Sequence, residues 1–202
     1  AAGTIFHTGS CSMTEPAIAD TTLAGMRRAR HAGALVSFDM NLRPALWPRG
    51  EDPAATIWQA LALADVVKLS AEELAFLAAS TGGEGHAFTR LWNGNAKLVV
   101  VTDGERATRW FTPNASGERN AYPVRAIDTT GAGDAFTAGC LYQFAKAAMD
   151  ATALATFAAD PDRLDAMLRF SAACGALAVT RAGSFAAMPA LAEVEAFLEQ
   201  HA

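Results

Sequence analysis

Apolar residues form short continuous runs along this chain, and stretches with apolar residues at helical spacing separate these runs. Four runs stand between turn or polar residues, at 3–8, 34–38, 65–69 and 98–102. Continuous apolar runs of this length are typical of parallel strands that are buried on both faces. Each run is therefore predicted to be a strand of one sheet.

The intervening stretches predict helices. The first helix is expected between Pro16 and Gly33, a proline and a glycine that suit a helix start and end. Further helices are expected at 53–64, from 70 onward, and at 86–92, 133–148, 161–179 and 194–198. Segments 108–112 and 121–125 predict an antiparallel pair around a loop at 113–120. This alternation of strands and helices predicts an α/β fold with a mostly parallel sheet.

The composition fits one globular domain, and residues 1–202 are expected to form a single one. Of the 202 residues, 51% are hydrophobic, and the formal net charge is −5. The charges are scattered, which argues against a nucleic-acid or membrane-binding surface. Cys11, Cys140 and Cys174 lack metal or disulfide spacing and are interpreted as reduced, buried residues of a cytoplasmic protein. No apolar run reaches membrane-spanning length.

Candidate chemistry is concentrated in residues 128–139, Asp-Thr-Thr-Gly-Ala-Gly-Asp-Ala-Phe-Thr-Ala-Gly. Residues 122–127 look like a strand, so the glycines are expected at a strand-to-helix junction. The first N–H groups of a helix lack partners inside it and carry partial positive charge, which favours an anion such as phosphate. A carboxylate there would repel phosphate, so the presence of Asp134 needs a chemical reason. General-base catalysis supplies one, because Asp134 would take a proton from a hydroxyl that attacks the phosphorus. The alternative is that Asp134 only caps the helix.

The same string resembles the C-terminal signature of the ribokinase-like (PfkB) carbohydrate kinases. The resemblance implies that Asp134 is the catalytic base and that Gly131, Ala132 and Gly133 form the anion hole for the transferred phosphoryl group. It also implies a three-layer α/β/α sandwich, with ATP and Mg²⁺ as cofactors. A monovalent cation, K⁺, would lie beside the anion hole, near Asp128, Thr130 and the backbone carbonyls near Ala178, Arg181 and Gly183.

A second stretch, residues 39–47, follows the second predicted strand and reads Asp-Met-Asn-Leu-Arg-Pro-Ala-Leu-Trp. Ligands of open α/β sheets gather at the carboxyl ends of strands. The stretch resembles the Asp-x-Asn-x-Arg segment of fructokinases and ketodeoxygluconate kinases. By that resemblance Asn41 and Arg43 bind sugar or phosphate, and Asp39 holds the loop. The alternative is a solvated loop with an Arg–Asp pair.

The third predicted strand ends in a similar position. Ser70 to Glu73 resembles the family's Asn-x-x-Glu motif, with Ser70 where asparagine is usual, which implies that Glu73 orders Mg²⁺ through water. The same pattern is also a helix capping box. Lys68, at the end of that strand, is expected either to meet a phosphate or to face solvent.

Two further segments are candidate nucleotide contacts. Thr102, Asp103 and Gly104 resemble a Thr-x-Gly turn that the family places against ATP. Residues 172–183 resemble its adenine-side helix and following loop, with Ala172 where relatives have asparagine or histidine. Gly175 on this helix would allow a flat base to pack closely, and it would equally allow another helix to do so.

The expected activity is transfer of the γ-phosphoryl group of ATP to a sugar hydroxyl. By resemblance fructose ranks first as substrate, ketodeoxygluconate second and ribose third. The family also has an N-terminal region with a sugar-binding signature and a β lid, so this chain is expected to match the C-terminal two-thirds of such a kinase. The full-length parent is expected to be a homodimer, and the isolated chain to associate through its exposed sheet edge. The alternative of another class is a non-catalytic nucleotide-binding fragment. The four histidines are assigned no role.

Overall fold

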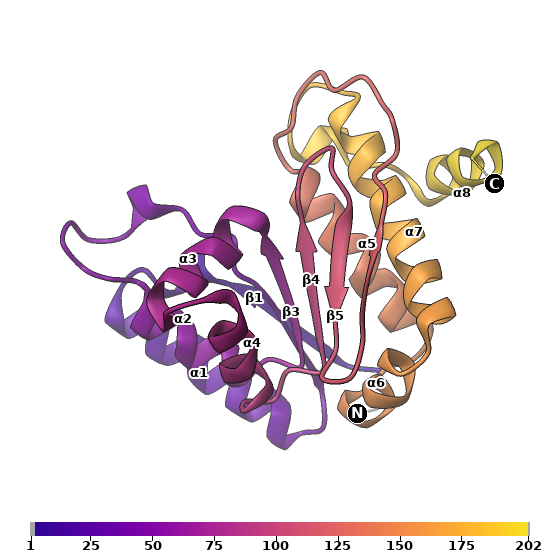
Figure 1. Cartoon of the computed structure of the whole chain (residues 1–202). Coiled ribbons are helices and arrows are strands. Elements are labelled where there is room, and N and C mark those ends of the chain that lie inside the picture. The colour runs from indigo at the N-terminus through magenta and orange to yellow at the C-terminus, as the bar shows by residue number, and fades with distance from the viewer. Residues whose placement is uncertain (1–2, 202) are drawn as a thin grey trace.

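The computed structural model describes residues 3–201 and places one six-stranded sheet between two layers of helices (Figure 1). The strands lie in the order β1-β2-β3-β4-β5-β6, so each strand is beside the next one in the chain. Strands β1 to β4 are parallel, whereas β5 and β6 are antiparallel. Their bounds are Ile5–Gly9, Leu35–Asp39, Val66–Ser70, Leu98–Thr102, Thr108–Phe111 and Ser116–Arg119. The expected α/β/α sandwich with a mostly parallel sheet is confirmed.

Helices α1 to α4 lie on one side of the sheet, and α5 to α7 lie on the other (Figure 1). The bounds of α1 to α4 are Pro16–His31, Ala54–Leu61, Ala71–Thr81 and Glu84–Trp92, and those of α5 to α8 are Ala132–Lys146, Ala151–Ala158, Pro161–Val179 and Leu191–Gln200. Three short 3-10 helices are η1 (Ser10–Met13), η2 (Pro44–Leu46) and η3 (Phe185–Ala187). Helix α6 was not expected from the sequence.

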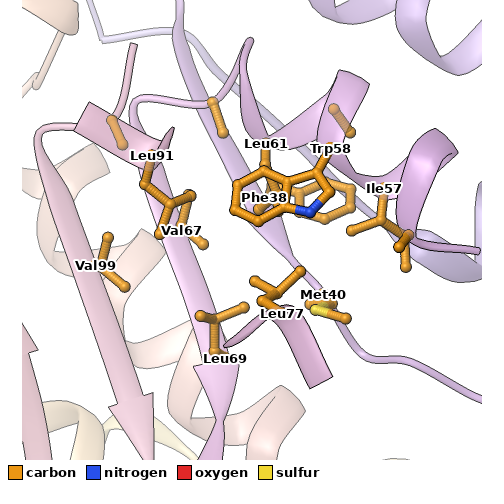
Figure 2. Packing of buried hydrophobic residues seen from close by; sticks show 14 of the residues in the cluster. Phe38, Met40, Ile57, Trp58, Leu61, Val67, Leu69, Leu77, Leu91 and Val99 are labelled. Atoms are coloured by element: carbon orange, nitrogen blue, oxygen red, sulfur yellow. The ribbon is translucent and has the colours of Figure 1, made fainter. Parts of the chain in front are cut away.

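The two faces of the sheet carry separate apolar clusters. Figure 2 shows the first, in which Phe38 and Val67 from the sheet meet Trp58 and Leu61 of α2. All five residues of β2 are buried, as expected for a strand covered on both faces. The second cluster lies under α5, α6 and α7 and includes Val66 and Phe144. Successive strand residues therefore point into different clusters, and this alternation decides which side chains face α5.

Two overlapping strand predictions are wrong: the one at 121–125, expected to pair with 108–112, and the one at 122–127, expected before the glycines. The partner of β5 is β6, Ser116–Arg119, a polar edge strand without an apolar pattern. Gly117 lies over Trp110, since a Cβ on it would be 2.7 Å from the ring. Residues 121–126 have no regular secondary structure, and Tyr122 instead packs against Phe197 of α8 at a ring-centroid distance of 4.9 Å. The chain therefore approaches α5 through an irregular segment, not a strand.

Candidate active site

Polar side chains meet at the carboxyl ends of β2 and β3, on the sheet face that α5 covers. Asp39 and Lys68 are register partners on these strands. Lys68 Nζ lies 3.2 Å from the Asp39 carboxylate, and Thr137 Oγ1 of α5 donates a 2.8 Å hydrogen bond to Asp39 Oδ2. Asp39 is only 4% exposed. One buried carboxylate thus joins two strands to the helix, so the structure gives Asp39 a positioning role broader than holding its own loop.

The glycine turn begins α5. Gly131 is the N-cap residue, with a φ of 80° that favours glycine, and Ala132 N–H donates to Thr129 O at 3.2 Å. The next N–H groups, of Gly133 and Asp134, belong to the first helical turn, which offers them no intrahelical acceptor. A Cβ on Gly133 would lie 3.0 Å from Lys68 Nζ, so the ammonium group stands directly beside the turn. Backbone donors and a cation therefore gather at the predicted anion hole.

Asp134 stands in the first turn of α5, and its side chain is exposed. Within residues 3–201 its carboxylate makes no hydrogen bond or ion pair. The simple capping alternative is wrong, because Gly131 occupies the N-cap position and no side chain caps α5. Asp134 is thus a free carboxylate at the start of α5, and its role as a general base stays a prediction.

A pocket of about 160 Å³ brings several predicted residues together. It is lined by His7, Thr8, Gly9, Cys11, Ser12, Asp39, Asn41 and Asp134. Asn41 and Asp134 therefore share one cavity, and their binding of an acceptor stays a prediction. Arg43 does not line it; this side chain is exposed and donates to Leu42 O at 3.2 Å.

Two residues of this pocket were missed or misread in the sequence. The sequence assigns no role to His7, because it has no partner at metal-ligand spacing. Cys11 was expected to be buried, but it lies exposed in η1, where Sγ donates to Asn41 O at 3.4 Å. Cys140 and Cys174 are buried as expected, and burial raises the pKa of their thiols to about 12 and about 11. The signal that would have found His7 is its position one strand away from Asp39, which sequence spacing alone does not show.

Glu73 braces the loop that carries Asn41. Its carboxylate accepts 2.7 Å hydrogen bonds from the N–H groups of Leu42 and Ser70, while Ser70 Oγ accepts from Glu73 N–H at 3.2 Å. The capping box is therefore confirmed, and it extends to the neighbouring loop. Burial raises the pKa of Glu73 above its ordinary value, although the two backbone donors act in the opposite direction. Both carboxylate oxygens have backbone partners and retain lone pairs for water, so an outer-sphere role toward Mg²⁺ stays a prediction.

The predicted nucleotide turn follows β4 at the same edge of the sheet. Thr102 pairs in register with Ser70, and Thr102 Oγ1 donates to Leu69 O at 3.4 Å. Gly104 is exposed with a φ of 59°, and Asp103 forms an ion pair of 3.1 Å with Arg106. The turn is thus close to the capping box, on the strand next to Lys68.

Asp128 connects the glycine turn to the loop after α7. Its Oδ1 accepts from Thr130 N–H and its Oδ2 from Gly183 N–H, both at 2.9 Å. These donors lower the pKa of Asp128. Ile127 N–H also donates to Val179 O at 2.7 Å. The structure therefore gathers the segments expected to hold a monovalent cation, although residues 3–201 contain no cluster of three or more His, Cys, Asp or Glu side chains suited to a metal.

Helix α7 packs closely on α5. A Cβ on Gly175 would lie 3.3 Å from Ala132 O, so this glycine allows the two helices to approach at the glycine turn. Ala172 is partly buried against the second apolar cluster. Helix packing accounts for both residues, and their predicted contact with adenine stays untested.

Comparison with known proteins gives consistent matches. Residues 1–191 match the family described as pfkB family carbohydrate kinase. The chain is 39% identical over 199 residues to probable fructokinase-7 of Arabidopsis thaliana, covering 96% of this chain and 55% of that protein. Among solved structures it resembles fructokinase of Xylella fastidiosa with bound ATP, with a TM-score of 0.95, 50% identity and coverage of 98% of this chain and 62% of that one. A double mutant of Vibrio cholerae fructokinase bound to fructose, ADP and potassium has a TM-score of 0.83 and 34% identity, with coverage of 96% and 60%.

The chain thus spans little more than half the length of that plant relative. No helix in the described part of the chain combines the length and apolar character needed to cross a membrane.

Proposed function

Because the chain belongs to the pfkB family of carbohydrate kinases, we propose that it carries the phosphoryl-transfer site of an ATP-dependent sugar kinase. The position of Asp134 is the observation that carries this proposal. Its unpaired carboxylate opens into the same pocket as Asn41, at the start of α5 and next to the cation of Lys68. A general base, an acceptor pocket and an anion-binding turn therefore meet within one site.

In the proposed reaction, Asp134 accepts the proton of a sugar hydroxyl while that oxygen forms a bond to the γ-phosphorus of ATP. The bond from the γ-phosphorus to the bridging oxygen breaks, and ADP leaves. The N–H groups of the glycine turn, with Lys68 beside them, stabilise charge on the transferred group. Removing one such backbone donor in other enzymes costs roughly 10²–10³ in rate.

Two ions are proposed to assist. Mg²⁺ would neutralise charge on the ATP phosphates and, because it keeps much of its water shell, would meet Glu73 through water. A monovalent cation would lie by Asp128 and Thr130, where the glycine turn meets the loop after α7. The V. cholerae relative bound to potassium supports this second site.

Fructose is the proposed acceptor, supported by the names of the similar proteins and by the charges of the pocket. Its lining residues are neutral or acidic, and Lys68 is already paired with Asp39. A neutral sugar suits such a lining better than ketodeoxygluconate, which brings a carboxylate. Ribose is also neutral and remains a comparison substrate.

Coupled measurement of ADP release tests the proposal. Two proteins are compared: the 202-residue chain, and a chimera that adds the part of X. fastidiosa fructokinase that this chain does not match. With ATP and Mg²⁺ we expect the chimera to turn over fructose in preference to ketodeoxygluconate and ribose. The substitution Asp134→Ala should abolish turnover and leave ATP binding intact.

The chain covers only 62% of the X. fastidiosa protein, and this favours one alternative for the isolated chain, namely nucleotide binding without turnover. ATP binding without ADP release by the chain, together with an active chimera, would support that alternative for the chain and kinase function for the whole protein. An inactive chimera with every sugar would refute the kinase assignment. Dimerisation of the whole protein and its cytoplasmic location stay predictions.

A further inference from the structure

A polar pair interrupts the sheet face that α5 covers. His7 of β1 and Ser37 of β2 are register partners, and His7 Nδ1 lies 3.1 Å from Ser37 Oγ. Ser37 is only 3% exposed, whereas Leu35, two residues earlier on the same face, belongs to the apolar cluster. Placing a buried hydroxyl there is costly unless it is hydrogen-bonded, and within residues 3–201 its side chain has His7 as its partner.

This hydrogen bond orients the imidazole ring. Because Nδ1 faces Ser37, the second ring nitrogen, Nε2, points away from that partner. Within residues 3–201, Nε2 has no hydrogen-bond partner. His7 lines the pocket that also contains Asn41 and Asp134. His7 is exposed on β1, so Nε2 is accessible to a ligand in the cavity in which the acceptor hydroxyl is proposed to meet its base.

Partial burial, rather than the surrounding charges, favours a neutral His7 ring. Partial burial lowers its pKa most strongly, the carboxylates of Asp39 and Asp134 raise it, and Lys68 lowers it again, with a net decrease. Asp39 and Lys68 are paired with each other. A neutral imidazole is suited to a hydroxyl group and does not attract an anion. The cavity of about 160 Å³ corresponds to roughly five water molecules, the size range of a small polar ligand.

We propose that His7 binds a hydroxyl group of the acceptor sugar through Nε2, and that Ser37 is a positioning residue that holds the ring for this contact. The inference rests on the proposed sugar-kinase function. It assigns to β1 a part in choosing the acceptor, because Nε2 would contact a different sugar hydroxyl from the one that Asp134 deprotonates. A site that hydrogen-bonds a particular hydroxyl discriminates strongly against the analogue that lacks it.

The test uses the chimera with His7→Phe, His7→Gln and Ser37→Ala, and His31→Phe as control. His31 is exposed at the end of α1 and does not line the pocket. We expect His7→Phe to raise the KM for fructose at least about tenfold, which corresponds to about 1.4 kcal/mol. The KM for ATP should stay within about twofold of that of the unsubstituted chimera, since His7 is proposed to contact the sugar and not ATP. Ser37→Ala should shift the fructose KM in the same direction by less, and His31→Phe should change neither value.

Singly deoxygenated fructose analogues provide the sharper readout. The unsubstituted chimera should discriminate against the analogue that lacks the contacted hydroxyl, and His7→Phe should lose this discrimination while keeping it at the other positions. Equal loss of fructose and ATP affinity, or unchanged discrimination in His7→Phe, would overturn the proposal. A thermal melt by circular dichroism separates misfolding from a local effect, with His7→Gln as the milder substitution.

Failure of this inference can be distinguished from failure of the proposed function. If the unsubstituted chimera releases no ADP with any sugar, the kinase assignment fails. The imidazole NMR signal of His7 in the same chimera, titrated with fructose, then decides whether sugar binds at this residue. A saturable shift that is absent for the His31 signal supports the contact, and no shift overturns it.

Discussion

Replacing Asp39 with asparagine tests whether one buried carboxylate holds α5 against the sheet. Asn keeps the size of the side chain and can still accept the hydrogen bond from Thr137, which is 2.8 Å long in the structure. It removes the countercharge of Lys68, whose Nζ lies 3.2 Å from the Asp39 carboxylate. Lys68→Met removes the other charge, and the double substitution removes both.

The magnitude follows from the burial of the pair. The side chains of Lys68 and Asp39 are 12% and 5% exposed, and removing one partner of a buried ion pair costs about 3–5 kcal/mol. Lys68 keeps some access to water, so we expect about 3 kcal/mol of lost unfolding free energy for each single substitution. The double substitution should be less destabilising than the sum of the two, with a coupling energy of about 2 kcal/mol.

Urea unfolding followed by circular dichroism measures these free energies on the 202-residue chain itself. The matched control is Asp65→Asn. Asp65 is also buried and paired, with Arg30 at 3.0 Å and Lys97 at 2.7 Å. It directly precedes β3, however, and so lies at the amino ends of the parallel strands, away from the site. Both aspartate substitutions should destabilise the fold, whereas only Asp39→Asn should lower ADP release by the chimera under conditions where the protein stays folded. A cost below about 1 kcal/mol for Asp39→Asn, or strictly additive single effects, would refute the reasoning.

Three further predictions concern other parts of the site. In urea titrations, Gly131→Ala should lower the unfolding free energy more than Gly33→Ala. Both glycines have a positive φ, which costs a non-glycine residue about 1–2 kcal/mol. Only at Gly131 would the added Cβ also meet a neighbouring atom, Ser184 Oγ at 2.9 Å. Equal costs would contradict the close approach of Gly131 to Ser184 Oγ. Because burial raises the pKa of Glu73 above its ordinary value of 4.5, the folded state binds a proton more tightly than the unfolded state does. The contribution of Glu73 to the unfolding free energy therefore falls as the pH rises from the ordinary pKa through the raised one. Glu73→Gln should remove that part of the pH dependence, and an unchanged stability–pH curve would count against it. Methylthiolation of Cys11 should block sugar-dependent ADP release by the chimera, because the exposed Cys11 lines the same pocket as Asp134. The Cys11→Ala variant should keep its activity after the same treatment. A methylthiolated protein with full activity would show that the thiol does not face the sugar.

Buried parallel strands and the glycine turn were predictable because burial on both faces and backbone conformation leave direct traces in the sequence. The run at 98–102 coincides with β4, and the helix expected at 161–179 coincides with α7. The capping box at Ser70 was equally local, since its two partners lie three residues apart. Each of these features depends on neighbours in the chain, so the chain alone contains the information.

The errors involve features that depend on contacts far along the chain. Strand β6 is polar and owes its extended form to pairing with β5, so hydrophobic periodicity missed it. The apolar residues at 121–125 resemble a strand in the sequence. In the structure, Tyr122 packs against α8, which accounts for an apolar residue there without a strand. His7 and Cys11 lie in the site because β1 pairs with β2, and this pairing is not visible in the sequence. The same limit applies to Asp39, whose link to Thr137 joins residues 98 positions apart.

The sequential strand order also has a consequence for how the molecule assembles. Strands β1 to β6 can add one after another through contacts between neighbours in the chain, and each addition closes a loop of modest length (Figure 1). The link between Asp39 and Thr137 instead closes a loop of about a hundred residues, which carries a larger entropic cost and favours late formation. A nascent chain would thus hold most of its sheet before α5 arrives. Such an intermediate has no anion hole and no base, so ligands that need the glycine turn would bind only after α5 has docked.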